Sequence, residues 1–184
     1  MALVDGVQGS AACAPAWYAL HVRSQFEYKV RDALSREHAA EPFLPLYLAR
    51  ARWSDRTKTV ERVLFPGYVF GRFESAARRK VIAIPGVVRI LGFGTQLVPV
   101  ADLEIDQVRR VVDSGLAVEP MPLLATGTRV RVAEGVLAGL EGIILRVKGS
   151  WRVVVSVPLL GRSVATELDT DQLMPLPAPA QRAA

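Results

Sequence analysis

The sequence has few of the residues that carry out covalent chemistry or bind metals. Its single cysteine, Cys13, cannot form an internal disulfide, which favours a reducing compartment. The two histidines, His21 and His38, have no second ligand at metal-binding spacing, so we expect structural roles for both. No Ser, His and acid cluster and no glycine-rich nucleotide fingerprint is present. These absences predict a binding protein without a cofactor or metal, and not an enzyme.

Long hydrophobic runs are also missing. No stretch approaches the roughly 18–20 apolar residues of a membrane span. The first fifteen residues lack the basic start and apolar centre of a signal peptide. Of the 184 residues 51% are hydrophobic and 22% charged, which is typical of a soluble globular protein with one large domain or two small ones. We therefore expect a cytoplasmic protein.

Changes in composition divide the chain. Small residues dominate the beginning, and a proline- and alanine-rich tail ends the sequence, so both are expected to be disordered. Pro120 and Pro122 are spaced to block a helix, which predicts a linker. The predicted boundaries are a leader over 1–15, a first domain over 16–118, a linker over 119–126, a second domain over 127–175 and a tail over 176–184.

The first domain mixes strand and helix patterns. Ser24 and Glu27 have the spacing of a capping box, which predicts a helix from Ser24 to about Ala39. Short, hairpin-like links favour an α+β fold with a mainly antiparallel sheet. The other predicted elements are strands at 17–22, 46–52, 57–73 (long and kinked) and 87–91, helices at 76–84 and 102–112, and a turn at 92–94.

The second domain shows no helix pattern. Valine and isoleucine recur in five short segments separated by glycine-containing turns. Five short strands in about 50 residues suit a small closed barrel, which removes exposed edges. The predicted strands lie around 130–132 and at 143–147, 151–157, 163–168 and 172–174.

The segment from Val63 to Phe73 is the most informative in the chain. It holds four of the ten Phe and Tyr residues of the protein. Within it, Pro66-Gly67 predicts a kink or bulge in an edge strand, after which Tyr68 and Phe70 share one face. This pattern has two interpretations: an ordinary sheet core, or a partly exposed aromatic surface that receives another protein.

Positive charge is concentrated beside this segment. Residues 50–80 contain nine basic and three acidic side chains, a net charge of +6 against +5 for the whole protein. Such a density is expected for a surface that contacts a phosphate backbone. A solvated charged face is the alternative.

Several segments resemble a known family. The residues at 17–20, 65–70 and 85–93 resemble the N-terminal domain of the NusG transcription factors. The glycine-rich stretch 127–142 resembles a KOW motif, and 155–168 resembles the last two strands of the family's barrel. The resemblance covers about 16–175 in the family's own order. It implies an NGN-type α+β domain followed by a small all-β, SH3-like KOW barrel.

The resemblance also implies a function. Members of the family bind the clamp helices of the largest RNA polymerase subunit and suppress pausing or termination, so a transcription elongation and antitermination factor is expected. The residues that match the family's polymerase-binding aromatics, or lie beside them, are Trp17, Tyr18, Phe65, Pro66, Tyr68 and Phe70. The candidates for contact with DNA or nascent RNA near the transcription bubble are Lys29, Arg36, Arg78, Arg79 and Lys80.

Other residues depart from the general factor. The segment 53–58 and the extended stretch 85–94 look more like the operon-specific paralogues of the UpxY and RfaH type. In the barrel, Leu160 occupies a position that is aromatic in the general factor, and Leu159, Leu160 and Arg162 are candidates for a loop that contacts the ribosome or Rho. Abundant valine and isoleucine predict a stable barrel.

Two further expectations come from the organisation of the chain. The linker offers no apolar face, so the domains are expected to be tethered, independently folded units. The alternative function is a KOW-containing RNA-binding or ribosome-associated protein without polymerase activity, which would use the barrel and the basic residues but not the aromatic segment.

Overall fold

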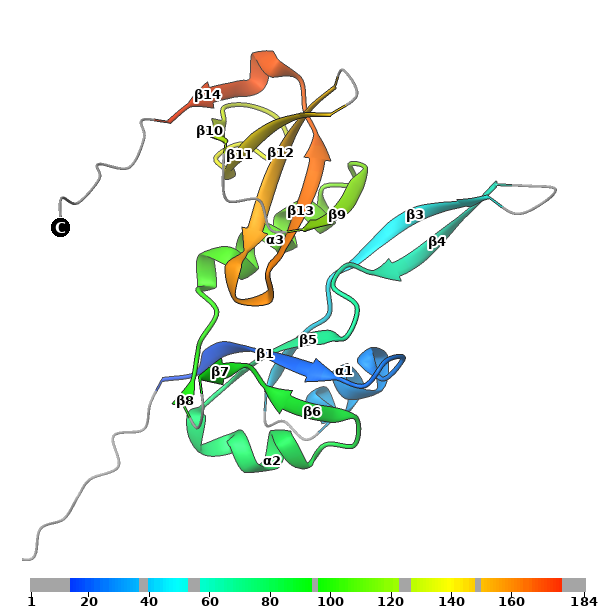
Figure 1. Cartoon of the computed structure of the whole chain (residues 1–184), viewed down its shortest axis with the longest axis vertical. Coiled ribbons are helices and arrows are strands. Elements are labelled where there is room, and N and C mark those ends of the chain that lie inside the picture. Colours follow the sequence, from blue (N-terminus) through cyan, green and yellow to red (C-terminus); the bar gives the residue numbers. More distant parts are fainter. Residues whose placement is uncertain are drawn as a thin grey trace, which may run out of the picture.

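The computed structural model describes residues 14–36, 40–52, 57–93, 96–122, 127–147 and 150–176. They form an N-terminal α+β unit (14–117) and a C-terminal β unit (118–176), as Figure 1 shows. Several predicted features lie outside the described residues. They are most of the leader, including Cys13, as well as His38, the turn at 53–56 and the tail beyond 176.

A four-stranded antiparallel sheet organises the N-terminal unit. Its strand order is β2-β5-β1-β6, with β1 at Ala16–Val22, β2 at Glu41–Phe43, β5 at Tyr68–Phe73 and β6 at Val87–Ile90. Helices α1 (Glu27–Arg36) and α2 (Arg78–Ala83) pack on one face, where Leu20 and Val69 share a buried cluster with Val30 and Val81. Helix α3 (Asp102–Asp113) packs on the other face.

A long hairpin projects from this unit (Figure 1). It consists of β3 (Leu46–Arg52) and β4 (Thr57–Val63). The predicted single strand over 57–73 is wrong, because residues 64–67 turn the chain between β4 and β5. The strand β5 is also central in its sheet and not at an edge.

Smaller elements complete the N-terminal unit. A 3-10 turn at Ser75–Ala77 precedes α2. Residues Gly92–Phe93 form the short strand β7, paired with β8 (Gln96–Leu97), where a turn was predicted.

The C-terminal unit is a six-stranded antiparallel sheet with the order β14-β10-β11-β12-β13-β9. All five predicted strands are present, within one to two residues at most ends. They are β10 (Thr128–Val132), β11 (Glu141–Val147), β12 (Ser150–Val157), β13 (Arg162–Glu167) and β14 (Leu173–Pro175).

The sixth strand, β9 (Val118–Pro122), corrects the predicted linker. It pairs with β13 at the end of the sheet, in the register Pro120↔Val164. An edge strand directs alternate N–H groups away from its neighbour, so two prolines two residues apart are tolerated there. Arg152 adds ion pairs to Glu119 of β9 and to Glu167. The linker residues 123–126 lie outside the described part of the chain.

The two units share one hydrophobic cluster. Ile105 and Val108 of α3 lie in it together with Val155 of β12, and the Arg110 guanidinium donates a hydrogen bond to the carbonyl of Ala138. Helix α3 contacts both β1 and β12, and Figure 1 shows it behind β12 and β13. The expectation of units that only share a tether is therefore wrong for this arrangement. That expectation rested on the proline-broken linker, whereas apolar side chains of α3 and β12 supply the contact.

Candidate functional site

Five aromatic side chains gather on one face of the N-terminal sheet. We call the set of Trp17, Phe43, Phe65, Tyr68 and Phe70 the aromatic face. Four of its rings form a chain: Trp17 lies edge-on to Phe43 at 6.3 Å between centroids, Phe43 stacks on Phe70 at 6.0 Å, and Phe70 lies edge-on to Phe65 at 6.1 Å. These separations fall in the range that aromatic pairs prefer.

Strand alternation and one turn place these rings. Phe43, Phe70 and Trp17 come from the adjacent strands β2, β5 and β1, at alternate positions that face the same way. The turn that begins at Phe65 brings its ring beneath Phe70. The N–H of Tyr68 bonds the Phe65 carbonyl at 3.0 Å, and Gly67 has φ of +82°. Proline followed by a glycine at positive φ is typical of a type II turn.

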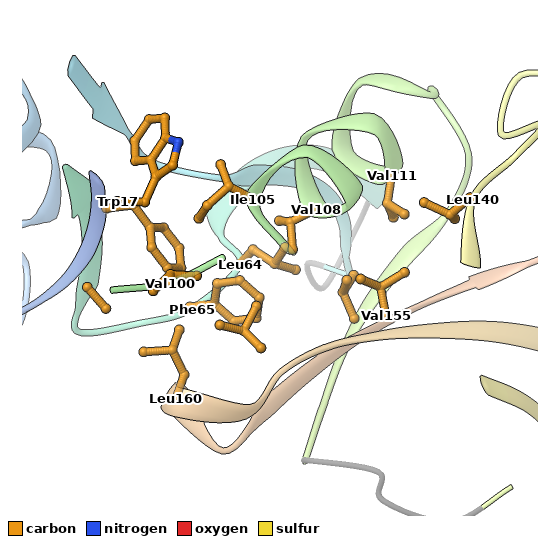
Figure 2. Packing of buried hydrophobic residues seen from close by; sticks show 14 of the residues in the cluster. Trp17, Leu64, Phe65, Val100, Ile105, Val108, Val111, Leu140, Val155 and Leu160 are labelled. Atoms are coloured by element: carbon orange, nitrogen blue, oxygen red, sulfur yellow. The ribbon is translucent and has the colours of Figure 1, made fainter. Parts of the chain in front are cut away.

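The centre of the aromatic face is buried. Trp17, Phe65 and Phe70 expose 3%, 1% and 0% of their surface, whereas Tyr68 is half-buried and Pro66 is exposed. Figure 2 shows the covering side chains, which come from α3 and from the C-terminal unit. The interpretation as a partly exposed hollow is therefore wrong for this arrangement. Two layers that sequence patterns do not place, α3 and the C-terminal unit, cover the rings.

Tyr18 does not belong to this face. As the neighbour of Trp17 in β1 it points to the opposite side of the sheet, where its ring packs on Phe73 at 4.8 Å. The prediction that Tyr18 lies beside the other candidate aromatics is therefore wrong. The alternation of side chains along a strand already contained this information.

The predicted partner loop of the C-terminal unit also lies elsewhere than expected. Leu160, in the 3-10 turn at Pro158–Leu160, is 8% exposed and belongs to the same cluster as Phe65 (Figure 2). Leu159 packs partly against that cluster, and Arg162 is exposed. In this arrangement Leu160 covers part of the aromatic face, Leu159 is half-buried, and Arg162 faces solvent.

The basic candidates lie on the helices behind the sheet. Lys29 and Arg36 are exposed on α1, and Arg79 and Lys80 are exposed on α2, while Arg78 is half-buried. The sheet separates all five from the aromatic face. The wider basic stretch over 50–80 is distributed over the β3–β4 hairpin, β5 and α2, so it does not follow a single element.

Sequence reasoning missed two contributors to the aromatic face. Phe43 connects Trp17 to Phe70, and its position in the short segment between Pro42 and Pro45 was the available signal. Arg109 of α3 lies over the rings of Trp17 and Phe43, at 5.6 and 5.0 Å, and 3.5 Å from a carboxylate oxygen of Glu41. A guanidinium over two rings adds cation–π attraction at the rim of the face.

The charged groups of the C-terminal unit are mostly paired. The Arg131 guanidinium, 2.5 Å from a carboxylate oxygen of Glu141, lowers the pKa of this glutamate, and Arg129 contributes at 3.3 Å. The hydrogen bond to Glu119 raises the pKa of Arg152. Among the described residues no group of three or more His, Cys, Asp or Glu side chains is placed to hold a metal ion. Within the same residues, no helix has the length and apolar character needed to cross a membrane.

The chain is similar to known proteins over most of its length. Residues 15–109 match the family described as "Transcription termination factor nusG". The "Transcription termination/antitermination protein NusG" of Pseudomonas aeruginosa is 30% identical over 171 residues, covering 85% of this chain and 96% of the relative. The protein of the same name from Yersinia pestis is 32% identical over 173 residues, with coverages of 85% and 94%.

A solved structure supports the fold. The structure described as "Domain interaction in Thermotoga maritima NusG" aligns with 86% of this chain and 96% of its own, with a TM-score of 0.50 and 22% identity. The family match, which spans the whole aromatic face, and the identity to the two relatives show which family this is. The chain belongs to the NusG family.

Proposed function

We propose that this protein is a transcription elongation and antitermination factor that binds RNA polymerase through the aromatic face. The observation that carries the proposal is the chain of rings from Trp17 to Phe65, built on a segment that matches the family. Large aromatic side chains dominate the binding energy of protein interfaces when they are placed at the centre. The clamp helices of the largest polymerase subunit are the proposed partner, and suppression of pausing or termination is the proposed result.

Binding requires the C-terminal unit to move. Leu160 lies against Phe65, a ring that the polymerase has to contact, so the covered form and the bound form exclude each other. The affinity for polymerase then depends on how often the C-terminal unit leaves the face. In the open form we propose that this unit is an SH3-like barrel and recruits a second partner, the ribosome or Rho, through Leu159, Leu160 and Arg162.

The basic residues complete the proposal. Exposed cations at Lys29, Arg36, Arg79 and Lys80, together with Arg78, suit contact with DNA or nascent RNA near the transcription bubble. Arg78 and Arg79 open α2, where the helix dipole is unfavourable for positive charge, which supports a functional reason for their presence. We further propose an operon-specific, cytoplasmic, non-enzymatic factor of the UpxY and RfaH type.

A pair of matched substitutions tests the docking role. Phe65 and Phe73 are both fully buried phenylalanines, but they lie on opposite faces of the sheet. Phe65→Ala is expected to weaken binding to core polymerase by about 2 kcal/mol or more, the scale of an interface hot spot. Phe73→Ala is expected to lower the melting temperature without a comparable loss of affinity. Both substitutions are made in a Leu160→Ala background, so that the C-terminal unit has little influence on the measured affinity of either variant.

Phe65→Ala is also expected to destabilise the fold itself. A ring with 1% exposure leaves a cavity, which costs about 3–5 kcal/mol in a core. The comparison with Phe73→Ala separates this cost from docking. Equal affinities of the two folded variants would contradict the proposed site.

A further inference from the structure

Two Pro-Gly turns lie against the same short connection in the N-terminal unit. In the first, over 65–68, the N–H of Tyr68 bonds the Phe65 carbonyl at 3.0 Å. In the second, over 84–87, the N–H of Val87 bonds the Ile84 carbonyl at 3.1 Å. The glycine of each turn has positive φ, +82° at Gly67 and +103° at Gly86. The first turn carries part of the aromatic face, and the second links α2 to β6.

The connection between β1 and α1 holds both turns. The N–H of Val22 bonds the carbonyl of Gly67, and the N–H of Arg23 bonds the carbonyl of Gly86, both at 2.8 Å. The ring of Phe26 lies so close to Gly86 that an added Cβ would meet it at 2.4 Å. The segment from Val22 to Glu27 therefore fixes the two turns relative to each other.

Glu27 accepts a hydrogen bond from a backbone N–H of the first turn that has no acceptor within the turn. In a turn of this type the N–H of the third residue has no partner within the turn. Here that group, the N–H of Gly67, donates to a carboxylate oxygen of Glu27 at 2.9 Å, across forty positions of sequence. Glu27 is 6% exposed, and burying a carboxylate is costly unless it is hydrogen-bonded or otherwise compensated. Its place in the first turn of α1, where the helix dipole favours negative charge, offsets part of that cost.

We propose that Glu27 is a positioning residue for polymerase docking. By holding the N–H of Gly67 it fixes the orientation of the turn from Phe65 to Tyr68, and so the angle at which these two rings meet a partner. This inference rests on the proposed function, because it assigns Glu27 a role in the same site. The carboxylate bonds the turn and is not proposed to contact the polymerase itself.

The test compares an acceptor with a side chain of similar length that cannot accept. Glu27→Gln keeps an oxygen in reach of Gly67, whereas Glu27→Met removes it. Asp32→Met is the control, since this carboxylate lies on the same helix and pairs with Arg31 at 2.7 Å. All variants carry Leu160→Ala, so that a looser covering unit does not mask a change in docking. Two quantities are measured: amide hydrogen exchange at Gly67 in the free protein, and affinity for core polymerase.

The methionine variant is expected to exchange the Gly67 amide at least about tenfold faster and to bind polymerase about tenfold more weakly, the factor for one lost charge-assisted hydrogen bond. The glutamine variant is expected to keep most of the protection of the Gly67 amide and most of the affinity for polymerase. The Asp32 control is expected to change neither the exchange rate nor the affinity. A folded methionine variant that matches the glutamine variant in affinity overturns the positioning role. If the parent protein does not bind polymerase, the proposed function fails, and exchange at Gly67 alone then supports or overturns the hold of Glu27 on the turn.

Discussion

Replacing Leu160 with alanine is expected to uncover the aromatic face. Leu160 is 8% exposed and belongs to the cluster that contains Phe65, although 95 positions separate the two. Truncating a buried leucine costs about 2–5 kcal/mol in protein cores. The contact here joins two units that can relax apart, so we use the lower value of about 2 kcal/mol.

This energy acts on the balance between the covered and the open form. About 2 kcal/mol changes an equilibrium constant roughly 30-fold, since each 1.4 kcal/mol is a factor of ten. As long as the covered form predominates, the apparent affinity for polymerase is proportional to the open fraction. Leu160→Ala is therefore expected to bind core polymerase up to about 30-fold more tightly than the parent.

Titration of the labelled full-length protein with core polymerase measures this change. Val136→Ala is the matched control, because Val136 lies in the same unit and is 68% exposed. It is expected to leave the affinity unchanged. Circular dichroism establishes whether the C-terminal unit of the Leu160 variant stays folded. A folded Leu160→Ala protein with the affinity of the parent would refute the idea that this unit competes with polymerase.

Two further predictions concern charge. Replacing Arg78, Arg79 and Lys80 with alanine is expected to weaken binding to elongation complexes and to reduce its salt dependence by about one unit of slope for each lost phosphate contact; equal slopes would show that these residues do not touch nucleic acid. Because Arg131 lowers the pKa of Glu141, the stabilisation by this carboxylate is present above the ordinary glutamate range and is lost as the pH falls through the lowered pKa. Glu141→Gln should therefore shrink the drop in melting temperature between about pH 6 and about pH 3, and an unchanged drop would contradict this reasoning.

Local patterns predicted most elements of the fold. The apolar spacing in 102–112 gave α3 to within one residue, and alternating valines gave the strands of the C-terminal unit. These signals are local, because side-chain periodicity follows directly from backbone geometry. The aromatic face was partly predicted for the same reason: Phe65, Tyr68 and Phe70 are close in sequence.

Two of the failures involve partners that are distant in sequence. Ser24 and Glu27 have the spacing of a capping box, yet α1 begins at Glu27, Gln25 adopts a φ of +67°, and the carboxylate bonds Gly67 instead. Similarly, the composition of 119–122 indicates a linker, but the free edge of β13 lets these residues pair. Local propensity is a weak prior that tertiary contacts override.

The pairing of β9 determines how far the two units can separate. Only Ser114 to Ala117 lie between α3 and β9, and the carbonyl of Ala117 accepts a hydrogen bond from Thr166 at 3.1 Å. Four extended residues span about 14 Å, which keeps the C-terminal unit beside the aromatic face. If β9 detaches, the connecting segment runs from 114 to 127 and reaches about 50 Å when extended. One five-residue strand thus sets the volume that the released unit searches, and with it the effective concentration at which it returns to the face or meets another partner.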